Sequence, residues 1–440
     1  MQKLKLSPSK LSGTVHIPPS KSFAHRALIC SALSVLSGST DSAVINNYSD
    51  SRDMQATENF IRRLGLLPCV SEDGKSVTVR KSTEMPAAGS VDCIESGSTL
   101  RFVIPIAAAL GLSCTFVGSG RLPERPLEVY EKLLPEHGIT MTRESSERFL
   151  PLAITGKLQS GDFELPGNIS SQFISGLMFA LPLLEGDSRI IITTELESKS
   201  YIDITISVLR KFGISIEETD CGYFVKGGQK YSCTDYTVEG DWSQAAFFFT
   251  MAALGSSPIV IEGLDEHSVQ GDRKICEIYS KMGLNIKFDG SSCIVFNPSS
   301  SEKFHGLKPV SFDASDIPDA VPAISTALSQ ADGTSIISGA ARLRIKECDR
   351  LTAVREAIEK LGGEIVEKPD GLVIKGVREL HSADVNGFND HRMLMSVSSV
   401  MQAVNGDVTV SDPLSIRKSY PHFYEDFRSL GGIADVINMG

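Results

Sequence analysis

The sequence lacks an apolar run long enough to cross a membrane. The longest such run, around Phe102 to Leu112, falls well short of the ~20 residues that a membrane span needs. No apolar stretch follows the lysines at the amino terminus, so we expect neither a signal peptide nor a transit peptide. We therefore expect a cytosolic protein with no membrane partner.

Closely spaced cysteines are also missing. The nine cysteines are scattered through 440 residues, and no pair has the spacing of a metal site or a redox motif. An odd, dispersed set in a chain of this length is typical of reduced thiols. We expect no disulfide framework and no metal site.

The glycine motifs of nucleotide-binding proteins do not occur. No Gly-x-x-x-x-Gly-Lys-Ser/Thr follows a predicted strand, and no Gly-x-Gly-x-x-Gly opens a helix. The residues therefore predict neither nucleotide hydrolysis nor a nicotinamide cofactor, and we expect no cofactor. A net charge of −11 argues against a nucleic-acid partner, because such proteins carry a basic face.

The sequence does contain a pattern that is repeated six times: an apolar helical segment, a glycine, then a short β-like run. The repeated glycines are Gly65, Gly138, Gly213, Gly283, Gly362 and Gly431. A glycine at this point suits a helix end in left-handed geometry. With the patterns upstream of each glycine, every repeat reads as a β-α-β-α-β-β unit.

Six units predict an α/β protein of two similar domains, each made of three units with buried helices and outward-facing sheets. Helices such as Phe173–Leu184 and Ala245–Leu254 are apolar on most sides and therefore predict burial. We place the first domain at 15–235 and the second at 1–14 and 236–440. Hinges are expected near 15–20 and 228–240. The alternative is two unrelated α/β domains, which the sixfold repeat disfavours.

Polar clusters precede the predicted helices, and basic residues gather in them. A helix start offers free backbone N–H groups and a partial positive charge, which suit phosphate and carboxylate. A single Ser or Asp there is most often only an N-cap, and a single Lys or Arg is usually solvated surface. The cations that co-locate at these starts are Lys21, Arg26, Arg101, Arg125, Lys346, Arg350, Arg392 and Lys418. This co-location in an acidic protein predicts binding of small anions.

Acidic residues occur among these cations. Asp319 and Glu347 are candidates for proton transfer or for stabilising a cationic intermediate. For Asp390 we favour a salt bridge. His391 titrates near neutral pH in its unperturbed state, although a single His is as often a structural hydrogen-bonding residue.

Nine short segments contain these clusters: PPSKSFAHRAL (18–28), ESGSTLRF (95–102), ERP (124–126), ISSQF (169–173), SKSYIDIT (198–205), DIPDA (316–320), LRIKECDRL (343–351), NDHRM (389–393) and the lysine of RKSYPHF (417–423). In these segments, and in their order along the chain, the sequence resembles the EPSP synthase family. The resemblance implies the family's fold of two three-unit domains, which agrees with the repeat.

The resemblance also implies two substrates and their binding residues. Shikimate 3-phosphate would be held by Lys21, Ser22, Arg26, Ser170, Ser171, Gln172, Ser198, Tyr201, Asp319 and Lys346. The phosphate of phosphoenolpyruvate would meet Lys21, the Gly97 backbone, Arg125, Gln172 and Lys418. Its carboxylate would meet Arg350 and Arg392, whose planar guanidinium groups match it bidentately.

The implied reaction is transfer of the enolpyruvyl group to the 5-hydroxyl of shikimate 3-phosphate, with release of phosphate, in the shikimate pathway of aromatic amino acid biosynthesis. Asp319 is our choice for the base that takes the hydroxyl proton. Glu347 or Lys21 is our choice for the group that protonates the methylene carbon, with His391 close by.

The chain departs from the family pattern at two places. Glu95-Ser96-Gly97-Ser98-Thr99 stands where many members have Asn-Ala-Gly-Thr-Ala, and Arg342 stands where an Asn is frequent. Neither change removes a charged anchor.

Two alternatives remain. UDP-N-acetylglucosamine enolpyruvyltransferase shares the fold and chemistry, and its usual mark is a catalytic cysteine on a mobile loop. Cys114 lies near the corresponding unit, but LSCTFVG reads as a buried strand. The other alternative is a non-catalytic anion-binding paralogue, which the presence of Lys21, Asp319 and Glu347 disfavours. We expect a monomer.

Overall fold

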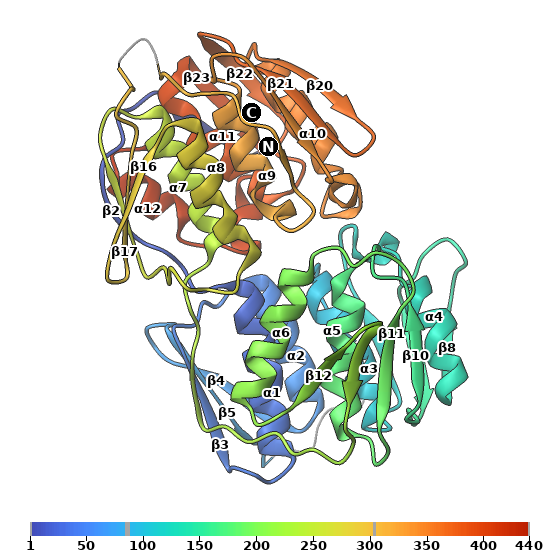
Figure 1. Ribbon diagram of the computed structural model, residues 1–440. Helices are drawn as coiled ribbons and strands as arrows, with labels where there is room; N and C mark the ends of the chain where they lie inside the picture. The colour runs from blue at the N-terminus through green and yellow to red at the C-terminus, as the bar shows by residue number, and fades with distance from the viewer. Residues whose placement is uncertain (1, 84–88, 302–304, 439–440) are drawn as a thin grey trace. The chain divides into compact units, whose positions relative to one another are not determined.

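The computed structural model describes residues 2–83, 89–301 and 305–438. It divides the chain into two units (Figure 1): a continuous unit, Pro19–Glu239, and a discontinuous unit, Met1–Pro18 with Gly240–Gly440. The chain therefore passes from one unit to the other twice, after Pro18 and after Glu239.

These boundaries differ by a few residues from those expected at 15 and 235. Strand β2 (Gly13–His16) pairs in parallel with β15 (Ile259–Glu262), which keeps residues 15–18 in the discontinuous unit. Strand β14 (Asp235–Thr237) pairs in parallel with β3 (Ser42–Asn46), which keeps residues 236–239 in the continuous unit. The last strand before each crossing, β2 or β14, thus belongs to a sheet of the unit that the chain is about to leave.

All six sheets in the described residues have four strands and one topology. In each sheet one edge strand is parallel to its neighbour, and the other two neighbouring pairs are antiparallel. In the continuous unit the orders are β14-β3-β5-β4, β6-β7-β9-β8 and β10-β11-β13-β12. Besides β3 and β14, the strands of this unit are β4 (Leu66–Val70), β5 (Ser76–Lys81), β6 (Ser90–Asp92), β7 (Cys114–Val117), β8 (Ile139–Arg143), β9 (Leu152–Gly156), β10 (Asp162–Leu165), β11 (Ser188–Ile192), β12 (Ile216–Thr219) and β13 (Gly222–Val225).

In the discontinuous unit the orders are β16-β17-β15-β2, β18-β19-β21-β20 and β22-β23-β1-β24. The amino-terminal strand β1 lies between β23 and β24 in the last sheet. Besides β2 and β15, the strands of this unit are β1 (Gln2–Ser7), β16 (Asn285–Asp289), β17 (Ser292–Phe296), β18 (Phe312–Asp313), β19 (Thr334–Ser338), β20 (Glu364–Lys368), β21 (Gly371–Lys375), β22 (Leu380–Val385), β23 (Val404–Ser411) and β24 (Ile433–Asn438).

Each unit also contains six α-helices among its described residues. Those of the continuous unit are α1 (Lys21–Leu36), α2 (Arg52–Arg63), α3 (Gly97–Ala109), α4 (Glu128–Leu133), α5 (Ser171–Ala180) and α6 (Lys199–Lys211). Those of the discontinuous unit are α7 (Trp242–Leu254), α8 (Ile275–Met282), α9 (Val321–Leu328), α10 (Arg350–Lys360), α11 (His391–Ser399) and α12 (Phe423–Ser429).

The buried helices that the sequence predicted are present. Every residue of α7, α9 and α11 is buried, and α1, α3 and α5 are buried over most of their length. A helix that is buried on all sides belongs inside a domain. Within each unit these helices lie among the sheets (Figure 1).

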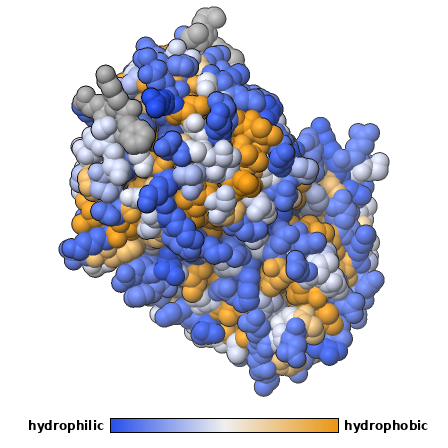
Figure 2. Space-filling model, turned by 45° about the horizontal axis from the view of Figure 1, so that its top comes forward, coloured by the Kyte–Doolittle hydropathy of each residue, from blue (hydrophilic) through white to orange (hydrophobic). Residues whose placement is uncertain are grey.

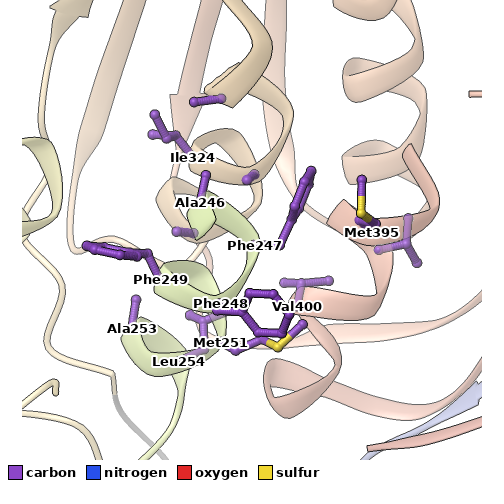
Figure 3. Packing of buried hydrophobic residues seen from close by; sticks show 14 of the residues in the cluster. Ala246, Phe247, Phe248, Phe249, Met251, Ala253, Leu254, Ile324, Met395 and Val400 are labelled. Atoms are coloured by element: carbon purple, nitrogen blue, oxygen red, sulfur yellow. The ribbon is translucent and has the colours of Figure 1, made fainter. Parts of the chain in front are cut away.

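Three consecutive phenylalanines show how α7 fills the core of the discontinuous unit. Successive residues turn by roughly 100° around an α-helix, so Phe247, Phe248 and Phe249 point to different sides of α7 (Figure 3). Phe248 packs on Phe423 at 6.1 Å between ring centroids, and Phe249 packs on Tyr279 at 5.5 Å. Burying each such ring contributes about 1.5–3 kcal/mol.

The six repeated glycines all have positive φ, from 76° at Gly65 to 111° at Gly283. Each follows the end of a helix and precedes an antiparallel strand, namely β4, β8, β12, β16, β20 and β24. The left-handed turn predicted from the sequence is therefore confirmed, and glycine is favoured there because a side chain would be strained.

No helix in the described part of the chain combines the length and the apolar character that a membrane span requires. The face seen in Figure 2 carries apolar residues in separate groups among hydrophilic ones.

Candidate active site

Three buried helices of the continuous unit begin directly after a serine. The hydroxyls of Ser96 and Ser170 accept hydrogen bonds from the backbone N–H groups of Thr99, at 3.2 Å, and Gln172, at 3.4 Å. Ser20 occupies the same position before α1. The first N–H groups of such helices lack intrahelical acceptors, so each start can bind an anion.

Lys21 is the first residue of α1. Its ammonium nitrogen lies 2.8 Å from Oδ2 of Asp53 in α2, and both side chains are largely buried. This contact fixes Lys21 beside the start of the helix. Ser22 follows it in the same turn.

Arg26, one turn further along α1, is buried. Its guanidinium donates to Oγ1 of Thr205 at 2.7 Å and to the carbonyls of Ser22 at 2.7 Å and Tyr201 at 2.9 Å. It also lies over the ring of Phe102, at 4.9 Å from the centroid. Burial lowers the pKa of Arg26 to about 10, so it remains a cation at neutral pH. Since these acceptors are neutral, its positive charge is available to a nearby anion.

Gly97 and Arg125 approach each other closely. A Cβ atom built on Gly97 would lie 2.5 Å from Nη1 of Arg125 and 2.6 Å from its Cζ. Glycine therefore allows the guanidinium to lie against the first turn of α3. Nε of Arg125 is buried and has no hydrogen-bond partner in the described residues.

Gln172 connects the starts of α3 and α5. Its Nε2 donates to Oγ of Ser98 at 2.8 Å, and its Oε1 accepts from Nη1 of Arg101 at 2.9 Å. Arg101 also donates to the carbonyl of Pro126 at 3.0 Å. The Arg101 guanidinium thus joins the Gln172 side chain to Pro126, the residue that follows Arg125.

The remaining predicted serines of this unit lie at helix starts. Ser171 is the buried first residue of α5, directly after Ser170. Ser198 is fully buried before α6 and has φ of 54°, which is rare for a residue with a side chain. Tyr201 lies in the first turn of the same helix.

In the discontinuous unit, Asp319 connects three cations. Its Oδ1 lies 2.9 Å from Nη1 of Arg350 and 3.5 Å from Nζ of Lys346, and its Oδ2 lies 3.1 Å from Nη2 of Arg392. Arg392 also donates to the Asp319 carbonyl at 2.9 Å and to Oγ of Ser243 at 3.0 Å. The 3₁₀ turn Pro318–Ala320 and the starts of α10 and α11 bring these groups together.

Burial alone would raise the pKa of Asp319. The charges of Arg392, Lys346 and Arg350 outweigh it and hold the pKa well below its usual value. Burial also lowers the pKa of Lys346 to about 8, against the opposing effect of Asp319. The cluster therefore combines a firmly ionised carboxylate with a lysine that changes charge slightly above neutral pH.

Arg350 donates to three carboxylates: Asp319, Glu347 at 2.7 Å and Asp390 at 2.8 Å. Burial disfavours its charge, but these carboxylates raise its pKa well above the ordinary value. The salt bridge favoured for Asp390 is thus present. Glu347 accepts from Nη2 of Arg350, so this nitrogen already has a carboxylate partner.

His391 and Lys418 lie near this cluster. His391 is buried in the first turn of α11, and its Nδ1 is 3.8 Å from Oδ1 of Asp390. Lys418 is also buried and donates to the carbonyl of Asn389 at 2.7 Å. The predicted residues of this unit therefore lie around the starts of α10 and α11.

Residues 6–427 match the family described as EPSP synthase (3-phosphoshikimate 1-carboxyvinyltransferase). The chain belongs to the EPSP synthase family. A curated relative from Clostridium kluyveri, named 3-phosphoshikimate 1-carboxyvinyltransferase, is 44% identical over the full length of both chains. A relative of the same name from Clostridioides difficile is 41% identical, again with both chains fully covered.

Solved structures support the fold. The EPSP synthase of Acinetobacter baumannii superposes with a TM-score of 0.81 at 23% identity, covering both chains completely. The enolpyruvyl transferase NikO of Streptomyces tendae superposes with a TM-score of 0.79 at 17% identity, covering 100% of this chain and 99% of the other. The predicted two-domain enolpyruvyl transferase fold is confirmed.

Three polar residues of the Asp319 cluster were not predicted as site residues. Asp241 caps α7 and accepts from the hydroxyl of Ser243 at 2.6 Å. Asp272 is buried in the 3₁₀ turn Gly271–Lys274, and burial together with the charge of Asp319 raises its pKa to about 8. The polar segment 241–243 could have indicated Asp241 and Ser243 from the sequence, whereas nothing in the sequence around Asp272 indicates a site residue.

No group of three or more His, Cys, Asp or Glu side chains with the geometry of a metal site occurs in the described ranges. Cys114 lies in β7 and is buried, and burial raises its pKa to about 11. A thiol in that setting is a poor proton donor or nucleophile at neutral pH.

Proposed function

We propose that the chain transfers the enolpyruvyl group of phosphoenolpyruvate to the 5-hydroxyl of shikimate 3-phosphate and releases phosphate. The main support for the proposed residue roles is the Asp319 carboxylate, which Arg350, Arg392 and Lys346 keep ionised. The cations keep this carboxylate unprotonated, and substrate anions that bind beside those cations would raise its pKa and so strengthen it as a base. Family membership over nearly the whole chain supports the same reaction.

Shikimate 3-phosphate is assigned to residues that surround α1, α5 and α6 in the continuous unit and to two residues of the Asp319 cluster. Arg26 supports this assignment because its guanidinium has only neutral acceptors among its hydrogen bonds. The full set is Lys21, Ser22, Arg26, Ser170, Ser171, Gln172, Ser198, Tyr201, Asp319 and Lys346.

The phosphate of phosphoenolpyruvate is assigned to Lys21, the Gly97 backbone, Arg125, Gln172 and Lys418. The close approach of Arg125 to Gly97 supports it, since a guanidinium and a helix start then face one anion. The carboxylate of phosphoenolpyruvate is assigned to Arg350 and Arg392. Glu347 then moves away from Nη2 of Arg350 as the substrate binds.

The proposed chemistry proceeds by addition and elimination. A proton is added to the methylene carbon of phosphoenolpyruvate, and the 5-hydroxyl oxygen attacks the neighbouring carbon while Asp319 takes the hydroxyl proton. The tetrahedral adduct then loses a proton from the new methyl group and loses phosphate by cleavage of its C–O bond. Glu347 or Lys21 supplies the first proton, and His391 lies near the same cluster.

Two experiments test this proposal. With phosphoenolpyruvate labelled by ¹⁸O at the bridging oxygen, the label should appear in the released phosphate; label retained in the organic product would contradict C–O cleavage. Asp319→Asn should lose most of its turnover while binding shikimate 3-phosphate within severalfold of the wild type. Intact turnover in this variant would remove Asp319 from the role of base.

UDP-N-acetylglucosamine is the alternative acceptor. A buried Cys114 with a raised pKa does not fit the catalytic cysteine expected for that activity. Product analysis with both acceptors present distinguishes the two. A paralogue that only binds anions would bind phosphate and yield no product with either acceptor.

The protein is further proposed to act as a cytosolic monomer. Each unit has its own buried hydrophobic cluster, which supports folding without a second copy. Light scattering should give the mass of one chain, and a concentration-independent dimer would contradict the proposal.

A further inference from the structure

A chain of buried hydrogen bonds connects three helices of the continuous unit. Nδ1 of His25 in α1 lies 2.8 Å from Oγ1 of Thr57 in α2, and that oxygen lies 2.8 Å from Oγ1 of Thr99 in α3. His25 is 1% exposed, and both threonines are fully buried. Hydrogen bonds shielded from water in this way are electrostatically stronger and fix the geometry of the groups that they join.

The two ends of this chain lie beside two groups proposed to bind phosphoenolpyruvate. Thr99 donates to the cap residue Ser96 at 2.9 Å, and Ser96 directly precedes Gly97. The Thr99 hydroxyl also lies 3.4 Å from the carbonyl of Asp53, whose carboxylate holds Lys21 at 2.8 Å. The start of α3 and the Lys21 ammonium are thereby joined through buried polar contacts.

His25 suits this position because it stays neutral. Burial lowers its pKa well below the usual value, and the charges of Lys21 and Arg26 lower it further. A second proton on the ring would place three cations within two turns of α1. Nε2 of His25 is buried and has no hydrogen-bond partner among the described residues, so Thr57 is the ring's polar contact.

We infer that His25, Thr57 and Thr99 form a positioning network that sets the spacing between the Lys21 ammonium and the Gly97 backbone amide for the phosphate of phosphoenolpyruvate. This inference rests on the proposed assignment of that phosphate. The three residues act through Lys21 and Gly97, and none of them is assigned to contact the substrate.

A network that served only folding would behave differently. Loss of a buried hydroxyl leaves its partners unsatisfied and destabilises any domain, but it does not by itself alter one KM and spare the other. The distinguishing readout is therefore the ratio of the KM for phosphoenolpyruvate to the KM for shikimate 3-phosphate. Lys21 is assigned to both substrates, but the Gly97 backbone is assigned to phosphoenolpyruvate alone, and shikimate 3-phosphate is assigned further contacts on α5 and α6 that the network does not hold.

The test compares Thr57→Val with Thr57→Ser. Valine has nearly the shape of threonine and removes both bonds, whereas serine keeps the hydroxyl. Thr250→Val is the matched control, because Thr250 is equally buried in the discontinuous unit and its hydroxyl lies 2.6 Å from that of Tyr279. Thr99→Val interrupts the same network from the other side and replaces Thr57→Val if the latter does not fold.

In Thr57→Val the KM for phosphoenolpyruvate should rise about tenfold, as expected when a binding group is misplaced, while the KM for shikimate 3-phosphate stays within about twofold. Thr57→Ser should restore the wild-type value, and Thr250→Val should retain it even if its thermal stability falls. Equal KM values in the wild type, Thr57→Val and Thr99→Val would overturn the inference, as would a parallel rise in both KM values. Absence of turnover in the wild type would instead overturn the proposed function.

Discussion

The carboxylate of Asp390 accepts two hydrogen bonds from the guanidinium of Arg350, at 2.8 Å from Nε and 3.3 Å from Nη2. The two side chains are 0% and 1% exposed. Asp390 also caps α11 by accepting from the N–H of Arg392 at 2.9 Å. One carboxylate thus fixes both arginines that are assigned to the substrate carboxylate.

Asp390→Ala should destabilise the protein by about 3–5 kcal/mol, because it removes the most deeply buried of the three carboxylates that pair with Arg350 and also removes the N-cap of α11. The control is Asp349→Ala, which removes the N-cap of α10 and a pair with Arg344 but at a more exposed position. Its expected cost is about 0.5–2 kcal/mol. Urea unfolding measures both variants, and equal losses would contradict the special role of the buried pair.

Gly97→Ala should weaken phosphoenolpyruvate binding without unfolding the protein. The new methyl group would meet the Arg125 guanidinium, which is the far end of a flexible side chain and can move aside. We expect the KM for phosphoenolpyruvate to rise about tenfold or more and the melting temperature to stay nearly constant. An unchanged KM would show that Arg125 does not depend on the space beside Gly97.

Asp272→Asn should stabilise the protein increasingly as pH rises from about 5 to 8. Folding raises the pKa of Asp272 from 3.8 to about 8 through burial, then through Asp319 and Asp241, against Arg392 and Lys346. Between these values the unfolded chain has lost a proton that the folded chain retains, so a rising pH favours unfolding. The substitution removes this pH-dependent contribution to the free energy of unfolding.

The advantage of Asp272→Asn over the wild type should grow by at most about 1.4 kcal/mol per pH unit and level off above pH ~8. Denaturant unfolding at several pH values measures it. Asp289→Asn, at an exposed position of the same unit, is the control and should show no such trend. A constant difference for Asp272→Asn would contradict the raised pKa.

Binding of shikimate 3-phosphate should weaken as pH rises through about 8. Burial lowers the pKa of Lys346 to about 8, with Arg350 and Arg342 lowering it and Asp319 and Glu347 opposing them. Above that pH the lysine loses the charge assigned to the substrate. Lys346→Arg retains a cation, so the fall in affinity between pH 7 and 9 should be smaller in the variant when Kd is measured by calorimetry.

The repeated architecture could be predicted because each repeat ends in a local signal. A helix followed by glycine and a β run requires only short-range geometry, and all six glycines adopt it. The sheet membership of β2 and β14 could not be predicted in the same way. Their partners, β15 and β3, lie more than 190 residues away in the sequence, so pairing depends on how the chain crosses between units.

The position of Lys21, Gly97 and Gln172 at helix starts could be predicted from local motifs, and the structure places them at the starts of α1, α3 and α5; their binding roles stay a prediction. Contacts among distant segments were not predictable. Nothing in the sequence indicates that Arg350 donates to Asp319, Glu347 and Asp390 together. The pKa of Asp272 likewise depends on its burial and on the charges of Asp319 and Arg392, which lie far away in the sequence.

The proposed transfer is tested most directly by phosphate release from phosphoenolpyruvate, measured in parallel with shikimate 3-phosphate and with UDP-N-acetylglucosamine as acceptor. We expect release with shikimate 3-phosphate only. Release with the nucleotide sugar only, or with neither acceptor, would contradict it.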